Sequence, residues 1–300
     1  MDPNLLYWRT EGQSFFSRVR TWFSLLDPAL LLASDPEIQK AHSLLAGRLE
    51  ELGQKVSSGS AASAEQSDAD SVFGLFASQV VASLLPHSTV KPALFWQFLL
   101  QSYYAGFNFA HRNRSSEQTG LRQLLLVAGT VSYAACAGAL PQIFVNRLNI
   151  TSPPVQAFLR SALPVPLSAA LAFFSVFTIR SEESETGVQV FDQQGNLAGV
   201  SKAAGKQAVR ETALSRAALF GATAAFPNLL LLLLKRTRLF QRNSLLAAPV
   251  RHVSTALVLG LMLPVSFSLF PQLGTIKREE LEEELQAGAA GGHLFYHRGL

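Results

Sequence analysis

The chain has 300 residues, of which 48% are hydrophobic and only 15% are charged, whereas soluble domains carry about 25% charged residues. Its formal net charge of +4 comes from basic residues that flank apolar runs, so the charge does not indicate nucleic-acid binding. Cys136 is the only cysteine, which excludes an internal disulfide and a multi-cysteine zinc or iron–sulfur site supplied by one chain.

Residues 1–70 are predicted to form an amphipathic N-terminal region that ends in a flexible linker. From Gln13 to Leu26, apolar residues share one helical face while Arg18 and Arg20 lie off it. This pattern fits a helix in a membrane interface or a helix packed on the chain's own bundle. A second helix is predicted from Pro36 to about Leu52, and the Ser, Ala and Gly content of 56–71 predicts the linker. The apolar face of the first helix contains Phe15, Phe16, Val19, Trp22, Phe23 and Leu26.

Six charge-free runs follow, each about long enough to cross a bilayer. They predict an all-α polytopic membrane protein with about five transmembrane helices, in a bundle that occupies 71–276. The first run is interrupted by Gln79, Pro86 and His87, so we expect it to lie in the interface or pack on the bundle. The runs are 71–90, 92–110, 123–146, 161–179, 217–234 and 253–276.

Proline occurs in five of these six runs. Each proline removes a backbone hydrogen bond, so several of the helices are expected to be broken. Broken helices recur in transporters, but proline is also common in membrane helices generally. The prolines are Pro86, Pro141, Pro164, Pro166, Pro227 and Pro264.

The run 92–110 contains polar residues at spacings that place them in one stripe on a helix. Polar side chains in a membrane span should face protein or water, not lipid. The stripe predicts either hydrogen bonds between helices or a path for a substrate. Its residues, the candidate substrate-path residues of this chain, are Gln97, Gln101, Tyr104 and Asn108.

The next run, 123–146, carries small residues that form one face on which another helix can approach closely. These are Ala128, Ser132, Ala135 and Ala139.

The long loop 180–216 is predicted to contain one small β-hairpin over Val188–Val200, because alternating apolar residues flank a Gln-Gln-Gly-Asn turn. Ser201–Arg216 should then form a polar helix that leads into the next span. The C-terminal segment 277–300 is predicted to be an acidic, amphipathic tail. Its acidic run Glu279–Glu284 fits a solvated helix face that docks through Leu281 and Leu285.

The basic loop 235–252 helps to predict the orientation in the membrane. With five spans starting at Pro92, this loop and the basic N-terminal segment lie on the same side, which the positive-inside rule assigns to the cytoplasm-equivalent compartment. The C-terminal tail is expected on the opposite side.

Catalysis is not indicated, because the chain lacks a phosphate-binding loop, a nucleotide fingerprint and a nucleophile elbow. His293 and His297 are four residues apart and could share a helical face, but no third ligand accompanies them, so we expect no metal site. We therefore predict no catalytic residue, no cofactor and no nucleic-acid partner.

Five segments along the chain are distinctive: Leu26-Asp-Pro-Ala-Leu-Leu-Leu, Pro92-Ala-Leu-Phe-Trp-Gln, Val190-Phe-Asp-Gln-Gln-Gly-Asn, Ser201–Arg216 and Phe295-Tyr-His-Arg-Gly-Leu. Together they resemble the sideroflexins, which are five-span proteins of the mitochondrial inner membrane, and the similarity covers most of the chain. The combination of Arg210-Glu-Thr, Leu234-Lys-Arg-Thr-Arg and Leu294-Phe-Tyr-His-Arg-Gly is most similar to a divergent vertebrate branch of that family.

The sequence also departs from the family. A His-Pro-Asp-Thr-Gly-Glu motif expected before the first apolar run is missing, and Leu100 stands where transporting members carry asparagine. Loss of that amide removes a donor and an acceptor from a polar path, which argues against serine transport. The resemblance to the divergent branch implies instead a role in assembling respiratory complex I, with effects on iron homeostasis. The implied partners are the lipid bilayer and complex I assembly factors, and the alternative is transport of a small amino acid.

Overall fold

The computed structural model describes residues 14–25, 90–110, 121–147, 152, 155, 158–238, 240, 243–286 and 292–299. The helix predicted from Pro36 to Leu52, the linker 56–71 and the apolar run 71–90 lie outside the described residues.

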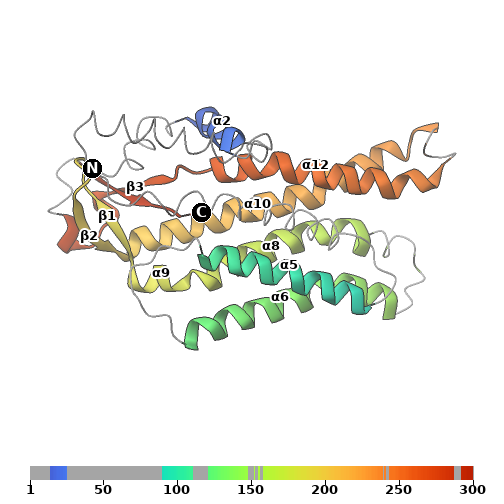
Figure 1. Ribbon diagram of the computed structural model, residues 1–300, viewed down its shortest axis with the longest axis horizontal. Coiled ribbons are helices and arrows are strands. Elements are labelled where there is room, and N and C mark those ends of the chain that lie inside the picture. Colours follow the sequence, from blue (N-terminus) through green and yellow to red (C-terminus); the bar gives the residue numbers. More distant parts are fainter. Residues whose placement is uncertain are drawn as a thin grey trace, which may run out of the picture.

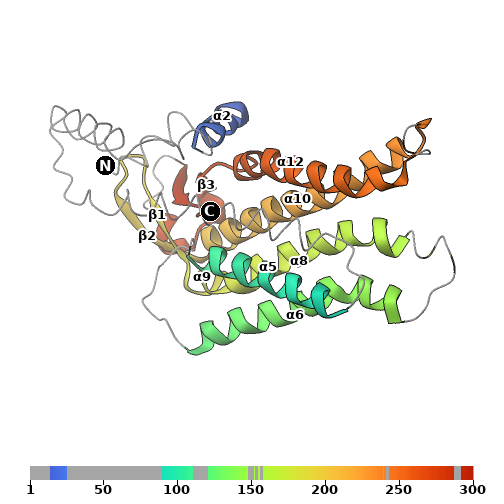
Figure 2. The same ribbon diagram turned by 45° about the vertical axis from the view of Figure 1, so that its right-hand side comes forward.

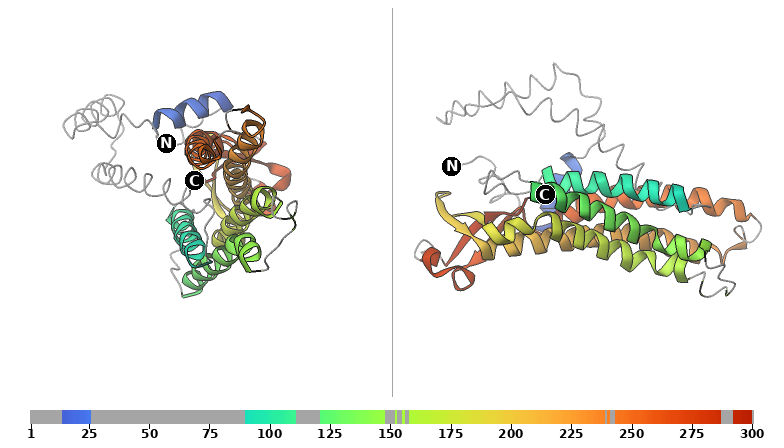
Figure 3. Two further views of the ribbon diagram at one scale, coloured as in Figure 1. Left: turned by 90° about the vertical axis from the view of Figure 1, so that its right-hand side faces the viewer. Right: turned by 90° about the horizontal axis from the view of Figure 1, so that it is seen from below.

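Five long helices form an elongated bundle (Figure 1). Helix α10 lies at its centre and packs against α8 on one side and α12 on the other, and α5 packs on α6. The view along the bundle shows these helices side by side (Figure 3). Their bounds are Val90–Ala110 (α5), Leu121–Arg147 (α6), Pro164–Ile179 (α8), Lys202–Leu234 (α10) and Ala247–Ser268 (α12).

The prolines break fewer helices than the sequence suggested. Pro141, Pro227 and Pro264 lie inside continuous helices. Among the described residues, proline interrupts the run 161–179, because the π-helical turn Phe158–Ala162 ends just before Pro164, which starts α8. A proline in a helix costs about 3 kcal/mol, and the packing of these helices on their neighbours offsets such a local cost.

Two helices in the described part of the chain, α10 and α12, are long and apolar enough to cross a membrane. Shorter apolar stretches occupy Leu124–Leu140 and Pro164–Ile179, and five complete spans are not established. Only 28% of the most apolar window of α10 is buried inside the protein, which is unlike the core helix of a soluble domain. The exposed large side chains that favour a lipid-facing surface include Phe95, Phe98, Phe174, Phe177, Phe226, Leu232, Leu257 and Leu261.

The face of α6 that packs on the bundle differs in part from the one predicted. Ala135 and Ala139 are buried as expected, but Ala128 and Ser132 are exposed. Val131 and Ala134 are buried in their place. Four-residue steps on a helix of 3.6 residues per turn rotate steadily around it, so a contact of several turns takes both three- and four-residue steps.

An antiparallel four-stranded sheet, in the order β2-β1-β4-β3, covers one end of the bundle (Figure 2). Strands β1 (Val188–Phe191) and β2 (Leu197–Ser201) form the predicted hairpin. Asp192 Oδ1 accepts hydrogen bonds from the backbone N–H groups of Gln194 and Asn196, which fixes the turn.

The other two strands correct the prediction of a single hairpin and of a wholly amphipathic tail. They are β3 (Leu273–Lys277) and β4 (His293–His297), and β4 pairs with both β1 and β3. His293 and His297 therefore lie on a strand and do not share a helical face. Buried Leu294 and Tyr296 contact the hairpin and the start of α10, which adds an apolar core beneath the sheet.

The acidic run is not a simple solvated helix. It forms the 3-10 turn Arg278–Glu280 (η4) and the short helix Glu283–Gln286 (α13), while Leu281 is buried as predicted. Glu282 Oε1 accepts hydrogen bonds from the backbone N–H groups of Lys202 (2.8 Å) and Ala203 (3.1 Å) at the start of α10. Burial alone would raise the pKa of the Glu282 carboxyl, but these hydrogen bonds and one from Ser201 lower it overall.

The N-terminal helix α2 (Phe15–Leu25) packs on α12 with a face that includes Arg18. Arg18 is buried and its Nε donates to the Ser268 carbonyl at 2.9 Å, and the Trp22 ring lies 4.8 Å from that of Phe267. The prediction that Arg18 lies off the packed face was wrong. Phe16 is 81% exposed, so the apolar face is divided between the bundle and the outside.

Helix α2 also corrects the predicted orientation of the N-terminal segment. It lies near Ser268, at the sheet end of α12, whereas the loop after α10 and the start of α5 lie at the opposite end (Figure 1). With the bundle in a bilayer, we expect α2 and the sheet on the same side of the membrane.

Single-cysteine variants in a Cys136→Ser background test this topology. An impermeant maleimide should label Ser14→Cys and Lys277→Cys from the same side, and Asn243→Cys only from the other, because all three positions are exposed. Labelling of positions 14 and 277 from opposite sides would contradict the packing of α2 on the sheet end of α12.

Candidate functional site

The predicted polar stripe on α5 does not act as one surface. Gln97 and Gln101 are partly buried, and Tyr104 and Asn108 are fully buried. A Cβ atom on Gly138 would lie 2.6 Å from Gln97 Oε1, so the Gln97 side chain lies tightly against α6. The stripe therefore divides between the contact with α6 and the centre of the bundle, and its role as a substrate path stays a prediction.

Tyr104 and Asn108 lie where α5 meets α8 and α10. The Tyr104 hydroxyl donates to the Ala172 carbonyl at 3.4 Å, and its ring packs edge-on to Phe220. Asn108 Nδ2 donates to the Tyr104 carbonyl at 2.8 Å, whereas Asn108 Oδ1 is buried and has no hydrogen-bond partner in the described part of the chain. Asn108 therefore supplies an unused acceptor inside the bundle.

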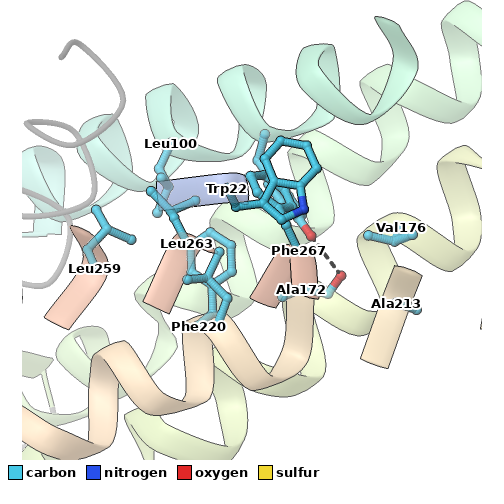
Figure 4. Close-up of a cluster of buried hydrophobic side chains, with 11 residues drawn as sticks. Trp22, Leu100, Ala172, Val176, Ala213, Phe220, Leu259, Leu263 and Phe267 are labelled. Carbon is cyan, nitrogen blue, oxygen red and sulfur yellow. Dashed lines mark hydrogen bonds between the residues drawn. The ribbon is translucent and has the colours of Figure 1, made fainter. Parts of the chain in front are cut away.

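Apolar side chains such as Leu100, Phe220 and Leu263 cluster inside the bundle (Figure 4), and Tyr104 belongs to the same cluster. Leu100 points into this cluster and is 5% exposed, so the position where transporting sideroflexins are expected to carry asparagine lies in an apolar environment. An amide at this position would need hydrogen-bond partners that aliphatic and aromatic neighbours cannot supply. The cluster contains Trp22, Leu100, Tyr104, Ala172, Val176, Ala213, Leu219, Phe220, Leu259, Leu263 and Phe267.

Three buried arginines lie where the bundle meets the sheet, and we call them the arginine cluster. They are Arg180 at the end of α8, Arg216 in α10 and Arg298 after β4. Each is among the largest fully buried side chains of the protein. The Arg298 carbonyl accepts a hydrogen bond from Arg180 Nη2 at 2.7 Å, and Arg216 and Arg298 both contact Phe267. The cluster joins segments that lie far apart in the sequence.

Arg180 has a complete set of partners. Its Nε and Nη2 donate to the two carboxylate oxygens of Glu183 at 2.5 and 2.7 Å, and Nη1 donates to Thr212 Oγ1 at 3.1 Å. Both side chains of this bidentate ion pair are buried. Because the pair also binds α10 and the segment after β4, it connects the hairpin, the bundle and the C-terminal segment.

Arg216 and Arg298 are less well compensated. Arg216 Nε has no hydrogen-bond partner in the described part of the chain, and its guanidinium lies 4.4 Å from the ring centre of Phe267 and 5.5 Å from that of Phe107. A desolvated cation–π contact contributes about 2 kcal/mol, whereas burying an ion costs several kcal/mol even after relaxation. The rings therefore offset only part of the cost of burying Arg216.

Arg298 donates from Nη2 to the Phe267 carbonyl at 3.2 Å, but its Nε and Nη1 are buried and have no partner among the described residues. Burial, followed by the positive charge of Arg216, lowers the pKa of Arg298. Glu211 acts in the opposite direction from a distance, and its carboxylate accepts hydrogen bonds from Gln207 at 2.9 Å and Tyr296 at 3.4 Å. The cluster thus keeps unused donors in a site that is closed to solvent.

Sequence reasoning missed this cluster. Arg180 and Arg216 border apolar runs at the two ends of the predicted loop 180–216, and Arg298 lies in the predicted tail. Basic residues at the end of a span look the same in the sequence whether they face headgroups or protein. The one local signal was Glu183, three residues after Arg180, which is the spacing of a helical ion pair.

Within the described residues, no group of three or more His, Cys, Asp or Glu side chains is placed to hold a metal ion. His293 and His297 flank buried positions of β4, and the His293 ring packs against that of Phe295. The guanidinium groups of the arginine cluster, in contrast, are suited to bind an anionic group.

Comparisons with known proteins place this chain among related sequences. The family model described as "Sideroflexins" matches residues 4–300. The chain is 48% identical to Sideroflexin-4 of Danio rerio, with both proteins covered in full. It is 33% identical to human Sideroflexin-4, with 100% of this chain and 93% of the relative covered, and 29% identical to human Sideroflexin-5, with 97% and 91% covered. No solved structure matches the chain.

Proposed function

The chain belongs to the sideroflexin family, and from this premise we propose that it is a multi-pass protein of the mitochondrial inner membrane that supports assembly of respiratory complex I. The five helices of the bundle are its proposed membrane spans. Effects on iron homeostasis would follow through the respiratory chain, since no metal-ligand cluster occurs in the described residues.

The apolar filling around Leu100 is the observation that best supports a scaffold over a serine carrier. A carrier must offer its substrate polar groups along the bundle. Here Leu100, Leu259 and Leu263 lie in one apolar cluster, and the neighbouring Tyr104 hydroxyl already donates to a backbone carbonyl.

Surfaces outside the bundle suit contact with assembly partners. Strand β2 lies at one edge of the sheet and exposes Leu197 and Val200. On α2, Phe16 and Phe23 are exposed. A strand edge that pairs with no further strand in the described residues, and exposed aromatic side chains, are common features of binding surfaces.

Amino-acid transport is the alternative function. It is favoured by Asn108, whose buried Oδ1 has no partner in the described part of the chain, and by the unused donors of the arginine cluster at the same end of the bundle. An ammonium group could donate to the amide oxygen while a carboxylate accepts from arginine.

Two measurements on the full chain distinguish these functions. Knockout cells should contain less assembled complex I on native gels and recover it when the wild-type chain is restored. Purified protein in liposomes should take up labelled serine no faster than empty liposomes. Saturable uptake of an amino acid that Asn108→Leu abolishes, together with normal complex I in the knockout, would establish the transporter and reject the scaffold.

A further inference from the structure

Within the described residues, the arginine cluster holds more positive charge than nearby carboxylates balance. Its three guanidinium groups have one directly paired carboxylate there, that of Glu183. When Glu211, which acts on Arg298 from a distance, is added, one positive charge still has no counter-charge among the described residues. Arginine does not lose its proton in proteins, so this charge persists. A buried cation without a partner is costly and calls for a counter-ion.

Arg216 and Arg298, which carry three of these unused donors, both contact one aromatic residue, Phe267. The Arg216 guanidinium lies over the Phe267 ring, and Arg298 Nη2 donates to the Phe267 carbonyl. The Arg298 backbone N–H donates to the Gln272 carbonyl at 2.9 Å, and Gln272 Nε2 is a further buried donor without a partner in the described residues. Donors from α10, from the segment before β3 and from the segment after β4 thus lie at the sheet end of the bundle.

We infer that Arg216 and Arg298, assisted by Gln272, bind a phosphate group with a net negative charge, supplied as free phosphate or as the headgroup of an anionic phospholipid. A phosphate carries one or two negative charges at neutral pH and accepts several charge-assisted hydrogen bonds, which matches the charge and the donors that remain. The inference goes beyond the proposed function, because a scaffold and a carrier could each use such a site.

Thermal unfolding of the full chain in nanodiscs tests the site and its source of phosphate. In discs of neutral phosphatidylcholine at constant ionic strength, replacing chloride by inorganic phosphate should raise the melting temperature in a saturable way. A second arm uses discs that contain phosphatidylglycerol and a phosphate-free buffer. If the melting temperature rises in the first arm alone, the ligand is free phosphate. If it rises in the second arm alone, the ligand is a lipid headgroup.

Variants then assign the response to the cluster. Arg216→Gln and Arg298→Gln should each weaken binding about tenfold or more, because each removes a charge-assisted contact. Arg210→Gln is the matched control, since Arg210 is exposed on the same helix as Arg216, and it should leave binding unchanged. Arg216→Met adds a second readout: without phosphate it should be at least as stable as the wild type, because it removes an unbalanced buried charge.

Equal wild-type melting temperatures in chloride, in phosphate and in phosphatidylglycerol discs would overturn the inference even if the variants failed to fold. A shift that persists unchanged in both glutamine variants would overturn it as well, since the anion would then bind elsewhere. The complex I and uptake measurements are independent of these outcomes.

Discussion

Gly205→Ala should destabilise the protein by about 2 kcal/mol or more, although alanine favours a helix over glycine by about 1 kcal/mol. A Cβ atom at position 205 would lie 2.0 Å from the backbone carbonyl oxygen of Glu183. Backbone cannot move aside as a flexible side chain does, so α10 and α9 (Ser181–Thr186) would have to separate. Steric overlap therefore outweighs helix propensity at this position.

The midpoint of thermal unfolding of the purified protein measures this effect, with Gly260→Ala as the control. Gly260 also lies within a long helix, but no heavy atom outside its local backbone lies within 4 Å of a Cβ added there. The control should be no less stable than the wild type. Equal stability of Gly205→Ala and Gly260→Ala would show that α9 does not pack against α10 at this distance.

Glu183→Gln should cost about 3–5 kcal/mol, the range found when one partner of a buried ion pair is removed. The amide is nearly isosteric, so the loss would come from charge and not from volume. It would leave the Arg180 guanidinium buried without a counter-charge, with only neutral partners such as the new amide oxygen, Thr212 and the Arg298 carbonyl. The positive charge of the arginine cluster would also increase.

Glu185→Gln provides the comparison, because Glu185 is an exposed carboxylate on the same short helix. Surface ion pairs contribute about 1 kcal/mol at most, so this variant should unfold near the wild-type temperature. If Glu183→Gln were equally mild, the Arg180–Glu183 pair would not be the connection between hairpin and bundle that its geometry indicates.

The sequence could predict the long helices because their signal is local. Apolar runs without charge, such as 123–146 and 217–234, form helices wherever they pack, since each peptide group is satisfied within its own segment. The β-hairpin was predictable for a similar reason. Its turn depends on Asp192 and its neighbours, which bond to one another within a few residues.

The candidate site could be predicted only in part. The four-residue spacing from Tyr104 to Asn108 correctly placed both on one buried face of α5. The same spacing did not show that Gln97 faces α6 or that Leu100 lies in the apolar cluster beside Tyr104. Periodicity gives the direction of a side chain on its own helix, but not which neighbour lies there.

By itself, then, the sequence determined the helical segments, the hairpin and the resemblance to the sideroflexins, because each depends on residues that are neighbours along the chain. Only the tertiary structure decided that 293–297 pairs with the hairpin, that Arg18 faces α12 and that Arg216 and Arg298 meet at Phe267. These contacts join residues up to 250 positions apart. An arginine beside an apolar run has the same local sequence whether it faces water or protein. Its electrostatic energy differs between these two environments, and only the tertiary packing decides which one surrounds it.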